Sequence, residues 1–141
     1  MIRGECKIRP QYGEVDQMGY VYHANYVNYC HRARTELMRE FGLNDKVLEE
    51  NGIMLPVVAM NLKYIKPSGY DDELRVYTTI KEMPLTRFKF EFEFVNEKGE
   101  KVCKAESTVV FVDSVNRKPM RVPELIKKVL EEKFSLEQVI V

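Results

Sequence analysis

The chain lacks an excess of charge of either sign. Its 141 residues carry 22 lysines and arginines against 22 aspartates and glutamates, so the formal net charge is zero. Proteins that bind nucleic acids usually show a basic excess or a basic stripe, whereas the longest basic grouping here is Lys127-Lys128. We therefore expect no nucleic-acid partner. A balanced charge also leaves self-association unopposed.

Long apolar runs and paired cysteines are missing too. No stretch approaches the ~20 apolar residues of a membrane span, and residues 1–5 lack the apolar core of a signal peptide. The three cysteines, Cys6, Cys30 and Cys103, are widely spaced and form no CxxC pair or Cys/His cluster. This pattern disfavours a metal site and a disulfide framework. We expect free thiols in a cytoplasmic protein that does not bind membranes.

Glycine and proline are few, at 7 and 6 residues, and the sequence shows no repeat, low-complexity tract or linker. By contrast, 45% of the residues are hydrophobic. A chain of this length can bury roughly 68–70% of its unfolded surface, which is enough for a well-packed core. We therefore expect one domain over residues 1–141.

Apolar spacing predicts one long helix near the N-terminal end. Residues 4–13 are weakly typical of a strand, and residues 14–24 predict a loop. From Asn25, the predicted N-cap, apolar side chains recur at helical spacing as far as Phe41, and Gly42 is placed to end the helix. Because the helix is apolar around much of its circumference, we expect a sheet to wrap around it.

The rest of the chain predicts mostly strands. Residues 44–51 predict a short second helix, and Pro123 opens a terminal helix expected over residues 123–133. Between them, four segments have apolar side chains at every second position: residues 58–64, 74–80, 88–94 and 103–111. Short connections make successive strands antiparallel neighbours. The predicted fold class is α+β, with a curled antiparallel sheet wrapped around one long central helix.

The segment before and within the long helix carries the clearest functional pattern. Asp16, Gly19, Tyr22, His23 and Tyr26 have the order and spacing found in hotdog-fold acyl-CoA thioesterases of the 4-hydroxybenzoyl-CoA thioesterase family, which the chain resembles. The resemblance is greatest to the small bacterial branch associated with the Tol–Pal cluster. It covers about residues 8–112 and includes three further matching segments: residues 33–36, 64–67 and 71–72.

The resemblance implies hydrolysis of short-chain or aromatic acyl-CoA thioesters. This reaction needs a group that attacks the carbonyl carbon or deprotonates water, and donors for the developing oxyanion. By resemblance, Asp16 is the nucleophile or general base, and the backbone N–H of His23 is an oxyanion donor. The N-terminus of the long helix favours the same anion through its dipole. Gly19 permits the bend between them. No cofactor is expected, because coenzyme A is part of the substrate.

Each of these residues also has a plainer interpretation. Asp16 alone could cap a loop, and the imidazole of His23 could form a pocket wall. Tyr22 and Tyr26 favour packing over acid chemistry, although Tyr22 stays a lesser catalytic candidate and Tyr26 a substrate contact. Two nearby carboxylates are expected to be structural or loop residues: Glu14 and Glu36. His31 and Cys30 depart from the family pattern, where Glu and an aromatic residue are frequent, which bears on substrate preference.

Coenzyme A carries phosphates, which relatives grip with basic residues, often from the neighbouring subunit. By position, Arg87 and Lys89 match such a segment, and Lys63 and Lys66 are weaker candidates; ordinary solvated side chains are the alternative. The resemblance also implies a homodimer, or a homotetramer of paired dimers, with sites between subunits.

Two rival functions are a hotdog hydroxyacyl dehydratase using His23 and a non-catalytic acyl-CoA-binding module. Asp16 argues against both.

Overall fold

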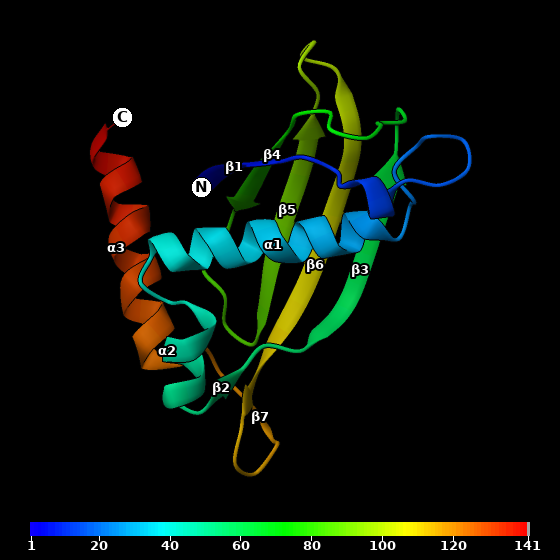
Figure 1. Ribbon diagram of the computed structural model, residues 1–141. Coiled ribbons are helices and arrows are strands. Elements are labelled where there is room, and N and C mark those ends of the chain that lie inside the picture. Colours follow the sequence, from blue (N-terminus) through cyan, green and yellow to red (C-terminus); the bar gives the residue numbers. More distant parts are fainter. Residues whose placement is uncertain (141) are drawn as a thin grey trace.

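One long helix lies across the face of a curved antiparallel sheet (Figure 1). The computed structural model describes the backbone of residues 1–140 and the side chains as far as residue 137. The central helix is α1 (Asn25–Glu40). Five strands cross the sheet in the order β1 (Ile2–Ile8), β4 (Leu74–Ile80), β5 (Arg87–Val95), β6 (Lys101–Asp113) and β3 (Val57–Tyr64).

Short elements complete the fold. Strands β2 (Ile53–Met54) and β7 (Pro119–Met120) pair with the end of β6. A one-turn helix, η1 (Tyr12–Glu14), follows β1, and α2 (Asp45–Glu50) follows α1. The helix α3 (Glu124–Ile140) lies near the far end of α1 (Figure 1). Within the described residues, no helix combines the length and the apolar character needed to cross a membrane.

The core lies between α1 and the sheet. The four phenylalanines of β5 are all buried, as their period of two predicts: Phe88, Phe90, Phe92 and Phe94. Burial of each side chain contributes roughly 1.5–3 kcal/mol. Tyr26 of α1 meets the Phe94 ring edge to face, with the centroids 5.4 Å apart. The predicted sheet wrapped around one helix is therefore confirmed.

Strand β1 approaches α1 so closely that a side chain at one glycine position would displace its neighbour on the helix. A Cβ added to Gly4 would lie 2.5 Å from Cδ1 of Leu37, a buried side chain of α1. The absence of a side chain at Gly4 therefore fixes how closely the helix packs on this edge strand.

Several boundaries differ from the sequence prediction. The first strand ends at Ile8 rather than residue 13, because Pro10 and η1 interrupt it. Asn25 is not the N-cap; Ala24 occupies that position, and Asn25 Nδ2 donates to the Glu14 carbonyl (2.9 Å). The second helix is capped by the side chain of Asn44, which accepts from Val47 N. The terminal helix continues to Ile140, beyond the expected residue 133.

The predicted pairing of β3 with β4 is wrong. Residues 65–73 carry the chain across the sheet, so β3 pairs with β6, and β4 lies between β1 and β5. Alternating side chains identify which face of a strand is buried but not which strand lies beside it.

Candidate active site

The loop between η1 and α1 folds into a small hairpin. Val15 bridges Val21, the Asp16 N–H donates to the Tyr20 carbonyl (2.7 Å), and the Gly19 N–H donates to the Asp16 carbonyl (3.0 Å). Gly19 has φ +80°, a left-handed conformation that favours glycine although an added Cβ would meet nothing. The bend expected at Gly19 therefore depends on the backbone conformation of this residue and not on a lack of space for a side chain.

The two carboxylate oxygens of Asp16 differ in their surroundings. Oδ1 accepts hydrogen bonds from Met18 N (2.9 Å) and Tyr20 N (3.2 Å), which closes the turn. Oδ2 accepts none from any described residue, and the side chain is only half-buried. Asp16 therefore caps its loop with one oxygen and leaves the other available for chemistry.

His23 lies just before α1, and its carbonyl oxygen, which shares a peptide unit with the Ala24 N–H, is held by two hydrogen bonds. That oxygen accepts from the Tyr64 hydroxyl (3.1 Å) and from Tyr26 N (3.3 Å). The N–H groups of His23 and Ala24 donate to no other described residue. Unpaired N–H groups at the positive end of a helix dipole are suited to an anion. The His23 backbone thus has the features of an oxyanion donor.

Glu14 ties the loop to the start of α1. Its carbonyl oxygen accepts from Tyr22 N and Asn25 Nδ2, each at 2.9 Å, and its carboxylate accepts from the Tyr29 hydroxyl (3.0 Å). Burial, together with this bond to a carboxylate, raises the pKa of Tyr29. Tyr29 is therefore a neutral donor that holds Glu14 in place.

Tyr22 and Tyr26 have different environments. Tyr22 is about half exposed, and its ring centroid lies 4.6 Å from that of His23. Tyr26 is only 3% exposed and packs against Tyr29, Tyr64 and Phe94. Burial raises the pKa of its hydroxyl. The surroundings of Tyr26 are those of a packing residue, whereas Tyr22 lies at the surface beside the proposed oxyanion donor.

Arg87 and Lys89 lie far from Asp16 of the same chain. They are at the start of β5, while Val95 at its other end pairs with Arg75 near the loop that touches Tyr20. Arg87 lies eight residue steps of strand, about 27 Å, and Lys89 six steps, about 20 Å, from that end of β5. Neither basic side chain therefore lies beside Asp16 of the same chain.

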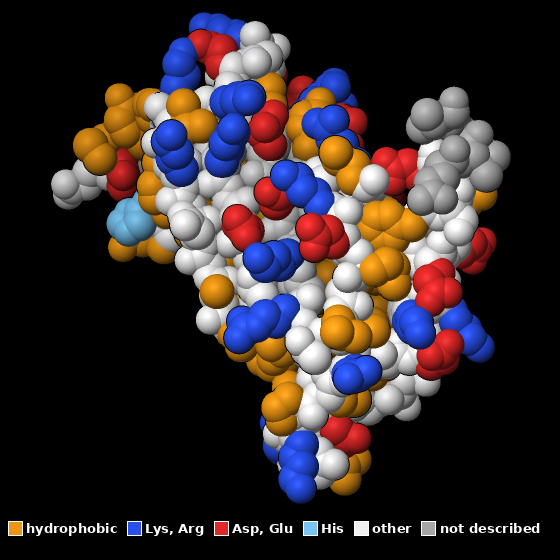
Figure 2. Space-filling view, turned by 180° about the vertical axis from the view of Figure 1, so that it is seen from behind, with side chains coloured by type: hydrophobic (Ala, Val, Ile, Leu, Met, Phe, Trp, Pro, Cys, Tyr) orange, Lys and Arg blue, Asp and Glu red, His pale blue; other side chains and the backbone are white. Residues whose placement is uncertain are grey.

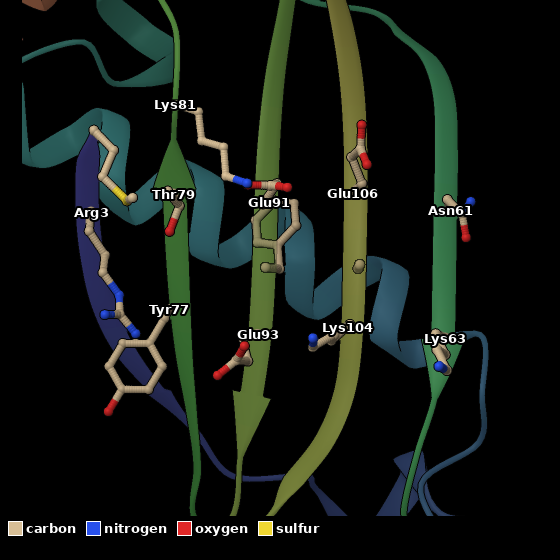
Figure 3. A pocket seen from close by; sticks show the side chains of 13 residues that line it. Arg3, Asn61, Lys63, Tyr77, Thr79, Lys81, Glu91, Glu93, Lys104 and Glu106 are labelled. Carbon is tan, nitrogen blue, oxygen red and sulfur yellow. The ribbon is translucent and has the colours of Figure 1, made fainter.

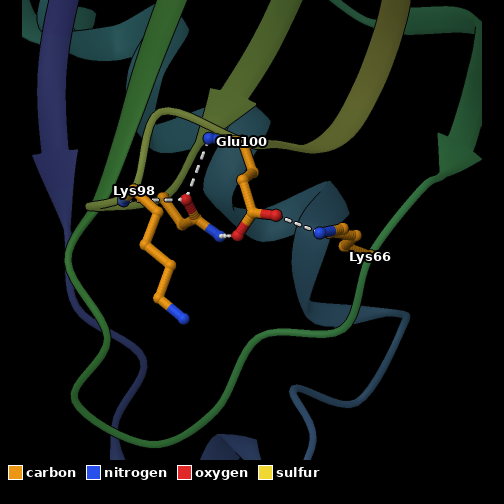
Figure 4. Close-up of polar contacts among 4 residues, drawn as sticks. Lys66, Lys98 and Glu100 are labelled. Atoms are coloured by element: carbon orange, nitrogen blue, oxygen red, sulfur yellow. Dashed lines mark hydrogen bonds and ion pairs between the residues drawn. The ribbon is translucent and has the colours of Figure 1, made fainter.

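The weaker basic candidates are placed differently again. Lys63 faces away from α1 and lines a hollow of about 550 Å³ on the outer side of the sheet, together with Lys104 and Glu106 (Figure 3). Basic and acidic side chains alternate over that side (Figure 2). Lys66 forms an ion pair with Glu100 (Figure 4), which lowers the pKa of that carboxyl group. Neither lysine is therefore an uncommitted cation beside Asp16.

Other residues of the loop were missed as site residues by sequence reasoning. Glu14 follows Gln11 by three positions, the capping-box spacing, and the Glu14 carboxylate accepts from Gln11 N (2.7 Å). This spacing was the available signal. Ser68 is buried and its carbonyl accepts from Val21 N (2.8 Å). Its partner lies 47 residues away, so the local pattern offered no sign of it.

Glu36 pairs with Arg39 on the exposed side of α1.

Among the residues with described positions, no group of three or more His, Cys, Asp or Glu side chains is gathered so that it could hold a metal ion. Asp16 offers this loop a carboxylate oxygen without a described partner, and the start of α1 offers backbone N–H groups without described partners.

Comparison with known proteins shows the family of the chain. Residues 10–130 match the Thioesterase-like superfamily. The chain belongs to this superfamily. The thioesterase family predicted from the residues around Asp16 is thereby confirmed, while the narrower Tol–Pal branch stays a prediction.

Individual relatives in the Thioesterase-like superfamily cover most of the chain. YneP of Bacillus subtilis is 35% identical over 115 residues, 82% of this chain and 83% of that protein. The acyl-CoA thioester hydrolase YbgC of Escherichia coli is 34% identical over 119 residues, 84% and 89% of the two chains. A DHNA-CoA thioesterase structure from Staphylococcus aureus aligns with a TM-score of 0.87 and 28% identity, covering 99% and 93%. The hotdog fold is therefore shared as well.

Proposed function

We propose that the chain hydrolyses acyl-CoA thioesters to a free acid and coenzyme A at the Asp16 loop. The observation that carries the proposal is the Asp16 carboxylate, which two backbone N–H groups hold through Oδ1 and whose Oδ2 accepts from none of the described residues. Superfamily membership and the similarity to YbgC support the reaction class. The similarity to a DHNA-CoA thioesterase supports aromatic acyl groups beside short aliphatic ones.

The chemistry divides between two groups. Oδ2 of Asp16 either attacks the thioester carbonyl carbon, giving an anhydride that water then opens, or takes a proton from the water that attacks. In both routes the carbonyl oxygen becomes negative and is stabilised by the His23 N–H at the start of α1. The C–S bond breaks, and the coenzyme A thiolate leaves and takes up a proton. Coenzyme A is part of the substrate in this scheme, and no cofactor takes part.

The proposal includes a homodimer that shares its sites, with a homotetramer as the next level of assembly. Among the described residues β3 pairs only with β6, so its other edge is open to a strand from a second copy. Val57 and Val58 of that strand are 52% and 51% exposed. A reducing, cytoplasmic location fits the three free cysteines.

The decisive experiment compares Asp16→Asn with Asp16→Ala on acetyl-, butyryl-, palmitoyl- and benzoyl-CoA, followed by thiol release. Asparagine keeps an oxygen that can accept from Met18 N and Tyr20 N, so its loop and thermal stability should match the wild type. We expect kcat to fall by at least ~10²-fold in both variants, the scale of a lost general base. Wild-type turnover in Asp16→Asn would refute the role of Asp16.

A single turnover in H₂¹⁸O tests for the anhydride. Label in the Asp16 carboxylate indicates attack by Oδ2 followed by opening of the anhydride at the Asp16 carbonyl. Label only in the product acid indicates that water attacks the acyl carbon, either directly with Asp16 as the base or in the anhydride, and trapping of the anhydride with hydroxylamine separates these two cases. Failure of the wild type to hydrolyse any thioester of the panel would instead favour a non-catalytic acyl-CoA-binding module.

Subunit sharing is tested by mixing two inactive variants, Asp16→Asn and the double variant Arg87→Gln/Lys89→Gln. A mixed dimer contains one site with Asp16 from one subunit and both basic residues from the other. We expect the mixture to recover activity that neither variant shows alone, measured after denaturation and refolding together. The absence of any recovery, with mixed dimers verified by mass, would place all of these residues in sites of a single chain.

A further inference from the structure

A second polar feature lies one to three turns along α1 from the proposed oxyanion donor. His23, Val27, His31 and Arg34 follow one another at intervals of four, four and three residues, so they share one side of the helix. A hollow of about 280 Å³ opens beside this side, between α1 and strands β3 and β6. Its walls include Val27, His31, Arg34, Val57, Met60 and Ser107.

Arg34 is the unusual member of this wall. It is only 8% exposed, and no ion pair among the described residues includes it. Its Nη2 lies 3.1 Å from His31 Nδ1, and its guanidinium lies 6.0 Å from the centroid of the Phe90 ring. Burial lowers the pKa of Arg34, and Asp45, which lines a neighbouring hollow together with Arg34 but forms no ion pair with it, opposes this shift. A buried guanidinium without a carboxylate partner is costly in free energy.

We propose that this hollow holds the acyl group and that Arg34 binds a carboxylate at its far end, so that thioesters of dicarboxylic acids are preferred. The inference rests on the proposed function and names its substrate class. A carboxylate presents two oxygens to the planar guanidinium, a geometry that forms paired charge-assisted hydrogen bonds. Ser107 supplies a further hydroxyl in the same wall.

The distances fit an acyl chain of moderate length. Eleven residues separate His23 from Arg34, which corresponds to about 16 Å along the helix axis. Long side chains on a helix lean toward its N-terminus, so the guanidinium of Arg34 lies closer to His23 than the Cα of Arg34 does. Valine and methionine side chains along the way suit methylene groups. An Arg34 side chain that leans back by about 6 Å leaves a gap of about 10 Å. An extended acyl chain of about six to eight carbons advances about 6–8 Å at roughly 1.2 Å per bond, and a hydrogen bond of about 3 Å at each end completes the span.

An aliphatic acyl group of the same length would fill the hollow but leave the guanidinium without an anion. Sites built around a buried polar group discriminate strongly against ligands that leave it unpaired. We therefore expect kcat/KM for adipyl-CoA to exceed that for hexanoyl-CoA by about tenfold or more. The two substrates share six carbons and differ only at the end that meets Arg34.

Two variants and one control test the inference by the ratio of these kcat/KM values. Arg34→Gln removes the charge, and His31→Glu places a carboxylate three residues before Arg34, where it can neutralise the guanidinium. Both should bring the ratio close to one. Arg39→Gln removes a different arginine of α1, which is exposed and paired with Glu36, and it should leave the ratio at the wild-type value.

The outcomes separate this inference from the proposed function. Equal kcat/KM values for both substrates in the wild type, or a preference that persists in His31→Glu, would overturn the role of Arg34 while hydrolysis itself stands. If Arg34→Gln fails to fold, the ratio measured in His31→Glu still decides the inference, because His31 is exposed and its replacement should not disturb the fold. If the wild type hydrolyses no thioester, the proposed function fails. In that case the inference is decided by ligand binding, measured as the rise in thermal stability. A larger rise with adipyl-CoA than with hexanoyl-CoA that is lost in His31→Glu supports it, and equal rises overturn it.

Discussion

At the scale of single residues, the candidate site depends on groups that hold other groups in place. Oδ1 of Asp16 closes the loop and thereby aims Oδ2, and the Tyr64 hydroxyl holds the carbonyl of His23, the residue whose own N–H is the proposed oxyanion donor. A fixed donor needs no reorganisation when charge develops, which is the basis of electrostatic catalysis. Tyr64 is in this sense a positioning residue.

The contribution of Tyr64 can be measured with Tyr64→Phe. The loss of one hydrogen bond of about 0.5–1.5 kcal/mol should lower kcat by about three- to tenfold while KM changes little. Tyr70→Phe is a matched control, because Tyr70 is exposed, packs on Tyr12 and has no described hydrogen bond from its hydroxyl. If both variants lowered kcat equally, the bond to His23 would have no special role.

Asp16 and His23 were predicted from the sequence because the family pattern places both within one short segment. Tyr64 was part of a matching segment, but its contact with His23 joins residues 41 positions apart. The sequence likewise did not show that Arg87 and Lys89 lie far from Asp16, because this distance follows from the pairing of the strands. Local spacing indicates which residue types are present, whereas their distances depend on long-range packing.

At the scale of elements, the contact between α1 and β1 depends on Gly4. A valine at this position should displace the Leu37 side chain and lower the free energy of unfolding by about 1–3 kcal/mol, as measured by urea denaturation. Leu37→Ala alone should cost about 2–5 kcal/mol.

The double variant Gly4→Val/Leu37→Ala provides the check. Because the valine would then occupy part of the space that the leucine vacated, the combined loss should be smaller than the sum of the single losses by more than ~0.5 kcal/mol. Simple additivity would show that the two positions do not compete for space.

Elements differ in how far their sequence determines them. The long helix and the phenylalanine strand were predicted because their apolar periods are unbroken. The first strand was extended too far, since its weak alternation did not show that Pro10 and η1 end it. The crossing of residues 65–73 was missed because no local feature distinguishes a connection between neighbours from one that crosses a sheet.

At the scale of the whole molecule, several buried groups resist ionisation. Burial raises the pKa of the Cys103 thiol to about 11, from a usual value of 9.0. Burial also raises the pKa values of Cys30 and Tyr26. The unfolded chain therefore loses these protons at lower pH than the folded chain does.

The free energy of unfolding should accordingly fall as pH rises from about 9 to about 11, because a group with a raised pKa stabilises the fold fully only below its unfolded value. Chemical denaturation at a series of pH values measures the slope. Cys103→Ala should show a shallower decline than the wild type, whatever its stability at neutral pH. A free energy of unfolding that stays constant over this interval would contradict the burial of these groups.

Tyr64 is the last residue of β3, whose outer edge pairs with no other described strand, and the Tyr64 hydroxyl also holds the carbonyl of His23. A second copy that extends the sheet at β3 would stiffen the strand from which this bond is made. Turnover per molecule would then depend on enzyme concentration, falling on dilution below the dissociation constant of the assembly and returning when the sample is concentrated. The abundance of the protein would thus set its specific activity without any effector.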